Sequence, residues 1–207
     1  MYVDAMTVGP VATNCYLLGD EATKHCALID PGAQAPDILR MAQEDGYTPV
    51  MILLTHGHFD HVDGVREVLN LVGSLPVYLH PADYPYAPAG PYSPTGLGEL
   101  EGIHLYREGD TVALDGLTVR VLETPGHTAG SVTLQAEDAL FTGDTLFCGS
   151  CGRTDFETSS QADMLRSLAR LARLEGDYKV YPGHEGASTL AREREGNPFL
   201  RYAVKHC

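Results

Sequence analysis

Residues 55–61 read THGHFDH, and they follow directly after the apolar run VMILL at 50–54. This stretch carries four candidate ligands within six positions: His56, His58, Asp60 and His61. Polar side chains crowded at the end of a buried strand are costly unless metal ions bind them. The i, i+2 spacing of His56 and His58 matches the period of an extended chain, so both imidazoles can lie on one side of it. The stretch therefore predicts a metal site where a strand ends.

The ligand types in this stretch narrow the choice of metal without fixing it. Three imidazoles and a carboxylate offer the nitrogen and oxygen ligands that suit zinc, and iron, manganese and cobalt accept the same ligands. A polar loop that happens to be rich in histidine is the alternative interpretation. Chance rarely produces H-x-H-x-D-H directly after a buried-strand pattern, so we favour the metal site.

The composition fits one domain, residues 1–207, because 43% of the residues are hydrophobic and only 20% are charged. A formal net charge of −14 disfavours a nucleic-acid partner, which would need clustered Lys and Arg. The first twenty residues have no basic start followed by an apolar stretch, and no run approaches the roughly 18 apolar residues that span a bilayer. We therefore expect a cytoplasmic protein without a membrane partner. The oligomeric state is left open.

Five cysteines are an odd number, widely spread, and we expect them to be reduced thiols rather than a disulfide framework. Cys148 and Cys151 form a single CxxC, which is a weak zinc or redox signal when no second pair exists. Packing or chance is the favoured interpretation of this pair. A metal-dependent or redox-sensing binding module is the alternative.

Short apolar strands alternate with helical patterns along the chain. Strands are predicted at 2–8, 14–18, 26–29, 50–54, 77–79, 111–114, 117–122, 131–134, 139–141 and 178–181. Helices are predicted at 36–45, 61–72, 161–174 and 187–195. Two strand-rich halves, each followed by helices, favour an α/β fold with two packed sheets that are covered by helices on the outer faces.

The proline-rich segment 81–98 is predicted to be a loop or lid. It interleaves three tyrosines, Tyr84, Tyr86 and Tyr92. These rings could line the mouth of a substrate site or simply cover neighbouring apolar surface. The second interpretation is the more usual one for loop aromatics.

Three later candidate ligands stand where predicted strands meet loops: His127 in TPGHTAGS, Asp144 in FTGDTLF and His184 in YPGHEG. A glycine directly precedes each of them, which lets the backbone turn sharply and bring the side chains to a common rim. The repetition carries the argument, because a single Gly-His pair is more often structural. Five histidines and two aspartates are enough for two metal ions when one carboxylate bridges them.

Asp30, in the turn Ile29-Asp30-Pro31-Gly32, is either an acceptor that orients a ligand imidazole or a plain turn residue. The other histidines lack the context of the ligand motifs: His25, His80, His104 and His206. We expect them to be surface or packing residues.

The order of H-x-H-x-D-H, then a His, an Asp and a His, resembles the metallo-β-lactamase superfamily over nearly the whole chain. The resemblance implies an αββα sandwich with the site at one edge, between the two sheets. It implies that His56, His58 and His127 bind a first metal. It also implies that Asp60, His61 and His184 bind a second, with Asp144 as the bridge. An Asp at 144 resembles the hydrolase branches and differs from the true lactamases.

The segments GDTLFCGSCGRTDF at 143–156, TPGHTAGS and NPFL at 197–200 resemble the small glyoxalase II-like hydrolases. That family cleaves thioesters of hydroxyacids and glutathione. The full enzymes contact glutathione through a Lys and two Tyr, and the matching positions here are Arg153, Asp155 and Gly186. Only the cation is retained, and the helical extension of the longer enzymes has no counterpart. The resemblance therefore implies thioester hydrolysis and leaves the thiol carrier open.

The expected activity is hydrolysis of a small-molecule thioester with two divalent metal ions, zinc first and iron or manganese as alternatives. A hydroxide that bridges the ions would be the nucleophile, and Asp60 would orient it as well as bind metal. Arg153 would either hold a substrate carboxylate or pair internally with Asp155. A rival is a persulfide dioxygenase with one iron on His56, His127 and Asp144, because that branch resembles the same motifs, including CGRTDF at 151–156.

Overall fold

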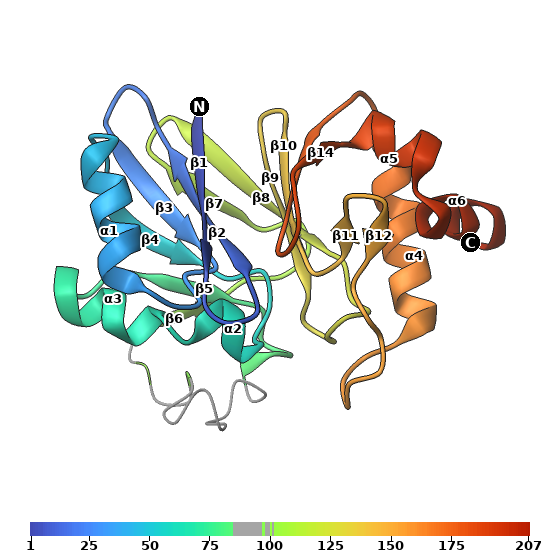
Figure 1. The fold of residues 1–207 in the computed structure, drawn as a ribbon, viewed down its shortest axis with the longest axis horizontal. Helices are drawn as coiled ribbons and strands as arrows, with labels where there is room; N and C mark the ends of the chain where they lie inside the picture. Colours follow the sequence, from blue (N-terminus) through green and yellow to red (C-terminus); the bar gives the residue numbers. More distant parts are fainter. Residues whose placement is uncertain (85–96, 98–99, 101) are drawn as a thin grey trace.

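The first of two large sheets is built from the N-terminal half of the chain (Figure 1). The computed structural model describes residues 1–84, 97, 100 and 102–207. In the order of the sheet, the strands are β1 (Tyr2–Val8), β2 (Thr13–Gly19), β3 (His25–Ile29), β4 (Thr48–Leu53), β5 (Val77–Leu79) and β6 (Ile103–Leu105). The pairs β1–β2 and β2–β3 are antiparallel, and the pairs from β3 to β6 are parallel. The carboxyl end of the parallel strand β4 leads into the loop that carries Thr55, His56 and His58.

The second sheet comes from the C-terminal half. Its order is β14 (Ser188–Thr189), β13 (Lys179–Pro182), β10 (Ala139–Gly143), β9 (Val132–Ala136), β8 (Leu117–Glu123) and β7 (Thr111–Leu114). Among its pairs, β10 and β13 are parallel and the rest are antiparallel. A small hairpin, β11 (Leu146–Phe147) and β12 (Ser150–Cys151), follows β10.

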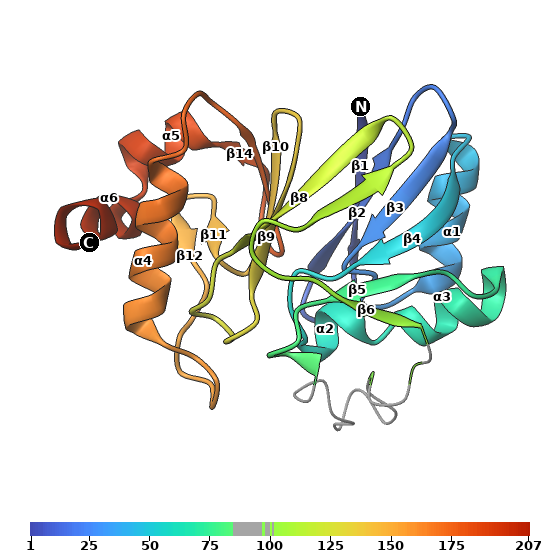
Figure 2. The ribbon, with the colours of Figure 1, turned by 180° about the vertical axis from the view of Figure 1, so that it is seen from behind.

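Helices cover the outer face of each sheet, as Figures 1 and 2 show from opposite sides. On the first sheet lie α1 (Ala35–Glu44) and α3 (Val65–Val72), with the short α2 (Phe59–Val62) at the edge. On the second lie α4 (Gln161–Ala172), α5 (Leu190–Gly196) and α6 (Pro198–His206). The α/β class and the αββα sandwich are therefore confirmed.

Strands buried on both faces create the core between these layers. In β2, Leu17 packs toward the helices of the first sheet and its neighbour Leu18 packs toward the second sheet, and both are fully buried. In β10, Leu140 packs toward α4 while Phe141 packs between the sheets. The alternation of side chains along a strand thus supplies apolar surface to both interfaces at once.

The predicted helix 61–72 is wrong as a single element. It is divided into α2 and α3, with Asp63 and Gly64 between them. A side chain at Gly64 would collide with the carbonyl oxygen of Pro31, so the backbone approaches too closely there for any larger residue. The predicted helix 187–195 begins later, because Ser188 and Thr189 form β14 before α5 starts.

Five elements were not predicted: β6, β11, β12, β14 and α6. The four strands are two or three residues long and carry little periodicity. Helix α6 did have a start signal, because Asn197 caps it by accepting hydrogen bonds from the backbone N–H groups of Phe199 and Leu200, with Pro198 at its first position.

Only Tyr84 of the three loop tyrosines belongs to the described residues, and it packs against the apolar cluster beneath the first sheet. Tyr86 and Tyr92 lie outside the described residues. No helix in the described part of the chain combines the length and the apolar character that crossing a membrane requires.

Candidate metal centre

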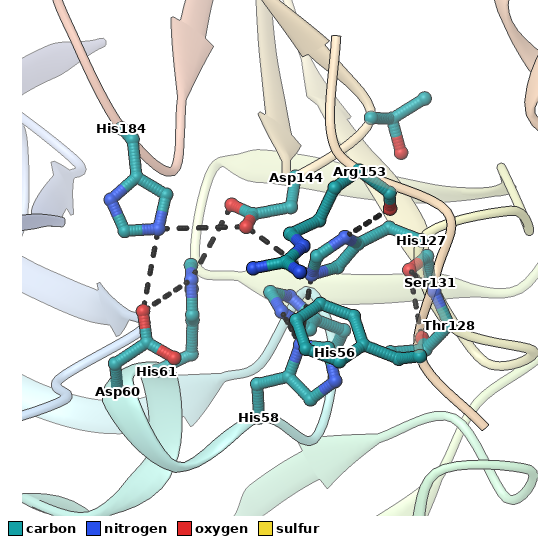
Figure 3. Close-up of polar contacts among 12 residues, drawn as sticks. His56, His58, Asp60, His61, His127, Thr128, Ser131, Asp144, Arg153 and His184 are labelled. Carbon is teal, nitrogen blue, oxygen red and sulfur yellow. Dashed lines mark hydrogen bonds and ion pairs between the residues drawn. The ribbon is translucent and has the colours of Figure 1, made fainter. Parts of the chain in front are cut away.

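All seven predicted ligands meet at one edge of the sandwich (Figure 3). His56 and His58 follow β4, and Asp60 and His61 lie in α2. The other three come from the second half of the chain: His127 follows β8, Asp144 follows β10 and His184 follows β13. Three sets bring their ligand atoms within 4.8 Å of one another: His56, His58 and His127; His56, His61 and Asp144; and Asp60, His61 and His184.

The first group, His56, His58 and His127, consists of imidazoles alone. His58 Nδ1 lies 3.1 Å from His56 Nε2 and 2.8 Å from His127 Nε2. Burial lowers the pKa of His56 and His127, and it lowers that of His58 to about 4. Neutral imidazoles carry a free lone pair on one nitrogen, which is the form that binds a metal.

The second group, Asp60, His61 and His184, mixes carboxylate and imidazole. Asp60 Oδ2 lies 3.5 Å from His61 Nε2 and 3.3 Å from His184 Nε2. Burial opposes the charge on His184, but hydrogen bonds to Asp144 and Asp60 outweigh it and raise its pKa to about 10. Burial likewise opposes the charge on Asp60, whereas His184 and His61 lower its pKa to about 2. Protons on the imidazoles thus offset the negative charge of the carboxylates, a role that a bound cation could also fill.

Asp144 lies between the two groups, as Figure 3 shows. Its Oδ2 is 3.3 Å from His127 Nε2 of the first group and 3.5 Å from His184 Nε2 of the second. Its Oδ1 is 3.4 Å from His61 Nε2. One carboxylate therefore reaches ligand atoms of both groups, as a bridging ligand must.

Two buried atoms of this cluster, His61 Nε2 and Asp144 Oδ1, have no hydrogen-bond partner among the described residues. Buried polar atoms without partners are costly and uncommon, and a bound cation would satisfy the carboxylate oxygen and a deprotonated imidazole nitrogen. A Cβ at position 183 would collide with Asp144 Oδ1, so Gly183 leaves open the space beside the cluster. Five imidazoles and two carboxylates form a donor set that fits two divalent cations of the borderline type.

Oxygen atoms behind the imidazoles fix which nitrogen faces the cluster. His61 Nδ1 donates to Asp30 Oδ2 at 2.9 Å, and His127 Nδ1 donates to the Arg153 carbonyl at 2.9 Å. Asp30 is 2% exposed and also accepts hydrogen bonds from the backbone and hydroxyl of Thr55. Asp30 is therefore an acceptor that orients the His61 imidazole, rather than a plain turn residue.

The end of the turn between β1 and β2 and the first residues of β2 support the second group, and the sequence did not reveal this. Thr13 donates to Asp60 Oδ2 at 2.8 Å, and the Ala12 carbonyl accepts from His184 Nδ1 at 3.3 Å. Asn14 donates through its amide to the carbonyls of Pro182 and Glu185 on either side of His184. Thr13 and Asn14 belong to no local motif, so only the three-dimensional contact identifies them.

A cleft of about 600 Å³ opens over the two groups. Apolar side chains line much of it: Val11, Phe59, Phe147 and Phe156. The ring of Phe156 packs edge-on against His58, at a centroid distance of 4.8 Å, and that of Phe147 packs against His184 at 6.0 Å. Each group thus has an aromatic ring beside it at the mouth of the cleft.

Arg153 also lines the cleft, but its guanidinium already has a partner. Its Nε and Nη2 each donate to Asp155 at 2.6 Å, and it lies over the ring of Phe156. Both members of the ion pair are more than 60% exposed. The internal pair with Asp155 is therefore present, and a substrate carboxylate would have to displace it.

All five cysteines are free, as expected. Cys151 lines the cleft, and burial raises the pKa of its thiol to about 11. Such a thiol is protonated and unreactive at neutral pH. The remaining histidines make other contacts: His25 with Asp115, His80 with Glu123, His104 with Tyr78 and His206 with Tyr202.

Residues 8–184 match the model of the metallo-beta-lactamase superfamily. An uncharacterized protein of Mycobacterium tuberculosis is 38% identical over 97% of this chain and 98% of its own. The probable metallo-hydrolase YqgX of Bacillus subtilis is 35% identical over 94% of this chain and 95% of its own. A hydroxyacylglutathione hydrolase of Pectobacterium atrosepticum is 37% identical over 88% of this chain but only 64% of its own length.

Solved structures agree with these likenesses. The BLEG-1 B3 metallo-beta-lactamase superposes with a TM-score of 0.87 at 32% identity, covering 96% of this chain and 99% of that one. TTHA1623 in a di-iron-bound form gives 0.82 at 35% identity, with 95% and 99% covered. ETHE1 from Myxococcus xanthus gives 0.80 at 29% identity, with 99% and 90% covered.

Proposed function

Since the chain belongs to the metallo-beta-lactamase superfamily, we propose that it is a binuclear metal-dependent hydrolase that cleaves thioesters. The observation that carries the proposal is the position of Asp144, whose carboxylate lies within 3.5 Å of imidazoles from both groups. A site for a single metal would leave several of the seven ligands without a role. If Asp144 is shared between two ions, every one of the seven has a metal to bind.

In this proposal His56, His58 and His127 would hold one ion, and Asp60, His61 and His184 would hold the other. Asp144 would serve as a ligand shared by the two sets. When bound, two divalent ions would acidify a water molecule and polarise a substrate carbonyl. Zinc is the expected metal, with iron or manganese as alternatives, and the di-iron form of TTHA1623 supports iron as an occupant of such a site.

Asp60 has a second task in the proposed reaction. Thr13 donates to its Oδ2, so the carboxylate is held in one orientation at the floor of the cleft. Because its pKa is about 2, it is ionised at neutral pH and can accept a hydrogen bond from the attacking water. The substrate carbonyl would lie between Phe147 and Phe156, whose rings line the cleft beside the cluster. The leaving thiolate needs little help from an acid.

The thioester assignment is supported by the segments that resemble glyoxalase II-like hydrolases and by the 37% identity to a hydroxyacylglutathione hydrolase. The direct test is hydrolysis of a lactoyl-glutathione thioester by the purified protein. We expect measurable turnover that disappears after chelation and returns with Zn²⁺. A fully metal-loaded protein that hydrolyses neither this thioester nor a matched one with a different thiol carrier would contradict the proposal.

Arg153 is the proposed contact for a substrate carboxylate, through a two-pronged ion pair. Arg153→Ala should raise KM severalfold and leave kcat nearly unchanged, because the ion pair would bind the substrate and the transition state equally well. Arg166→Ala is the matched control, since Arg166 also forms an exposed ion pair with a neighbouring Asp but lies on α4. Unchanged KM in Arg153→Ala would leave the internal pair with Asp155 as the whole role of Arg153.

The likeness to ETHE1 favours keeping a second candidate, a persulfide dioxygenase that uses one iron. Its ligands would be His56, His127 and Asp144, and Asp144 does lie 3.3 Å from His127. The two candidates differ in a measurable way. Two metals per chain with thioester turnover favour the hydrolase, whereas one iron per chain with oxygen uptake on a persulfide favours the dioxygenase.

A further inference from the structure

Asp83 is a buried carboxylate that binds no metal in the proposal above. It follows β5 and is 1% exposed. Its Oδ2 accepts hydrogen bonds from the Gly57 N–H at 2.9 Å and the Thr128 hydroxyl at 2.6 Å, and its Oδ1 accepts one from the Gly130 N–H at 2.8 Å. All three donors are uncharged. Burying a carboxylate among neutral donors costs free energy unless each hydrogen bond is well formed. The donor groups around Asp83 therefore have little freedom to move.

The three donors belong to two loops that come from different sheets. Gly57 stands between His56 and His58, in the loop after β4 of the first sheet. Thr128 and Gly130 follow His127, in the loop between β8 and β9 of the second sheet. Asp83 therefore connects the backbone segments that carry all three imidazoles of the first group.

Ser131 extends this connection within the second loop. Its hydroxyl oxygen accepts the Thr128 N–H at 3.1 Å and lies 2.8 Å from the Thr128 hydroxyl (Figure 3). Because Thr128 gives its own hydroxyl proton to Asp83, the Ser131 hydroxyl donates to Thr128 in turn. The carboxylate thus fixes a chain of hydrogen bonds directly beside His127.

Close packing explains why both loops carry glycine opposite Asp83. A Cβ at position 57 would lie 3.1 Å from the Cβ of Asp83, and one at position 130 would lie 2.5 Å from its Oδ1. A larger residue at 130 would push its loop away from the carboxylate, and one at 57 would require a shift of a few tenths of an ångström. The second group depends on other residues, since its members are held by Thr13, Ala12 and Asp30.

We propose that Asp83 is a positioning residue that sets the spacing of His56, His58 and His127 by joining their two loops, and so controls metal affinity at the first group alone. This inference rests on the proposed function, because the metal is what the first group would hold. If Asp83 only stabilised the fold, its loss would lower the stability of the protein and weaken metal binding at both groups. If Asp83 positions the imidazoles, its loss weakens metal binding at the first group alone.

Two variants that each retain one intact ligand group distinguish these roles. His184→Ala keeps the first group, and His58→Ala keeps the second. Adding Asp83→Asn should weaken Zn²⁺ binding in the His184→Ala protein by about 10- to 100-fold, the usual loss when a partner behind metal ligands is removed. In the His58→Ala protein it should leave the Zn²⁺ dissociation constant unchanged. Competition with a chromophoric chelator measures both constants without any turnover assay.

Asp20→Asn is a matched control for general damage. Asp20 is also buried, at 6% exposed, and also accepts backbone N–H groups, from Ala22 and Gly116. It too joins the two sheets, but at the opposite end of β2 from the ligands. It should alter neither dissociation constant. Thr128→Val removes one of the three hydrogen bonds to Asp83 and should give a smaller loss of Zn²⁺ affinity at the first group. This variant provides a second measurement if Asp83→Asn folds poorly.

Equal weakening of both groups by Asp83→Asn, or no weakening of the first, would overturn the inference. The proposed function fails by a different result. A wild-type chain that binds two metals, shows the selective Asp83 effect and hydrolyses no thioester would defeat the hydrolase and leave the positioning role of Asp83 intact.

Discussion

The first and second ligand groups hold similar numbers of side chains but are organised on different physical grounds. In the first, three imidazoles made neutral by burial point at one another across two loops. In the second, Asp60 and the shared Asp144 bring negative charge, and the pKa values of His61 and His184 are raised in response. Loop geometry therefore sustains the first group, whereas charge balance sustains the second.

The two groups should therefore lose metal for different reasons. A group that depends on geometry is sensitive to residues that space its loops, even when no charge changes. A group that depends on charge is sensitive to loss of a carboxylate. Asp144 is the exception to the contrast because it belongs to both, so the largest effects should be found there.

Asp144→Asn should cause the largest loss of activity. The amide keeps the shape but removes the negative charge that faces both groups, so we expect less than one tightly bound metal per chain and a fall in kcat/KM of more than about 100-fold. Asp138→Asn, which breaks an exposed ion pair with Lys179, is the control. Metal analysis that finds two ions in Asp144→Asn would show that the two groups do not share this ligand.

His58→Ala and His184→Ala test whether the groups are separate. Each variant removes one ligand from one group, so each should retain about one metal per chain and lose activity by at least about 100-fold. His25→Ala, outside the cluster, should retain both metals. Loss of both metals from either single variant would mean that the cluster binds metal as one unit. That result would contradict the division of the ligands into two separate groups.

Asp30→Asn should weaken the second group more than the first, because Asp30 accepts the Nδ1 proton of His61 directly and reaches His56 only through the Thr55 hydroxyl. We expect metal binding at the second group to weaken by about 10- to 100-fold, and the free energy of unfolding to fall by about 1–3 kcal/mol, because one buried donor loses its acceptor. Asp115→Asn, which breaks the exposed pair with His25, is the control. A protein whose first group weakens equally would show that Asp30 supports the fold rather than the second group.

Replacing Cys148 and Cys151 together by Ser should have the smallest effect. Neither thiol is among the clustered ligand atoms, and the Cys151 thiol is protonated at neutral pH. Metal content and thioester hydrolysis should both remain within about twofold of the wild type, which is small against the 10- to 100-fold losses expected near the ligands. Loss of metal would instead support the metal- or redox-sensing interpretation of the CxxC.

The ligands could be predicted because their signals are local. His56 to His61 lie in one motif, and His127, Asp144 and His184 each follow a glycine at the end of a strand. The residues behind them could not, because the contacts span long stretches of chain: Thr128 reaches Asp83 across 45 positions, and Asn14 reaches the Pro182 carbonyl across 168. Asp83 sits in the ordinary turn HPAD, where nothing distinguishes it from a solvent-exposed aspartate.

A contact between distant segments also lies at the misplaced helix boundary. The apolar spacing at 61–72 is that of one helix, whereas the structure interrupts it at Asp63 and Gly64, where the backbone lies close against the Pro31 carbonyl. By contrast, the layers of the fold followed from strand and helix patterns that each segment carries by itself.

Activity measured while the chelator-treated chain is loaded with increasing Zn²⁺ distinguishes a two-ion site from a one-ion site. Hydrolysis of the lactoyl-glutathione thioester should rise until two equivalents per chain are bound, with each group holding one ion. Full activity at one bound equivalent, unchanged by a second, would contradict the two-ion site.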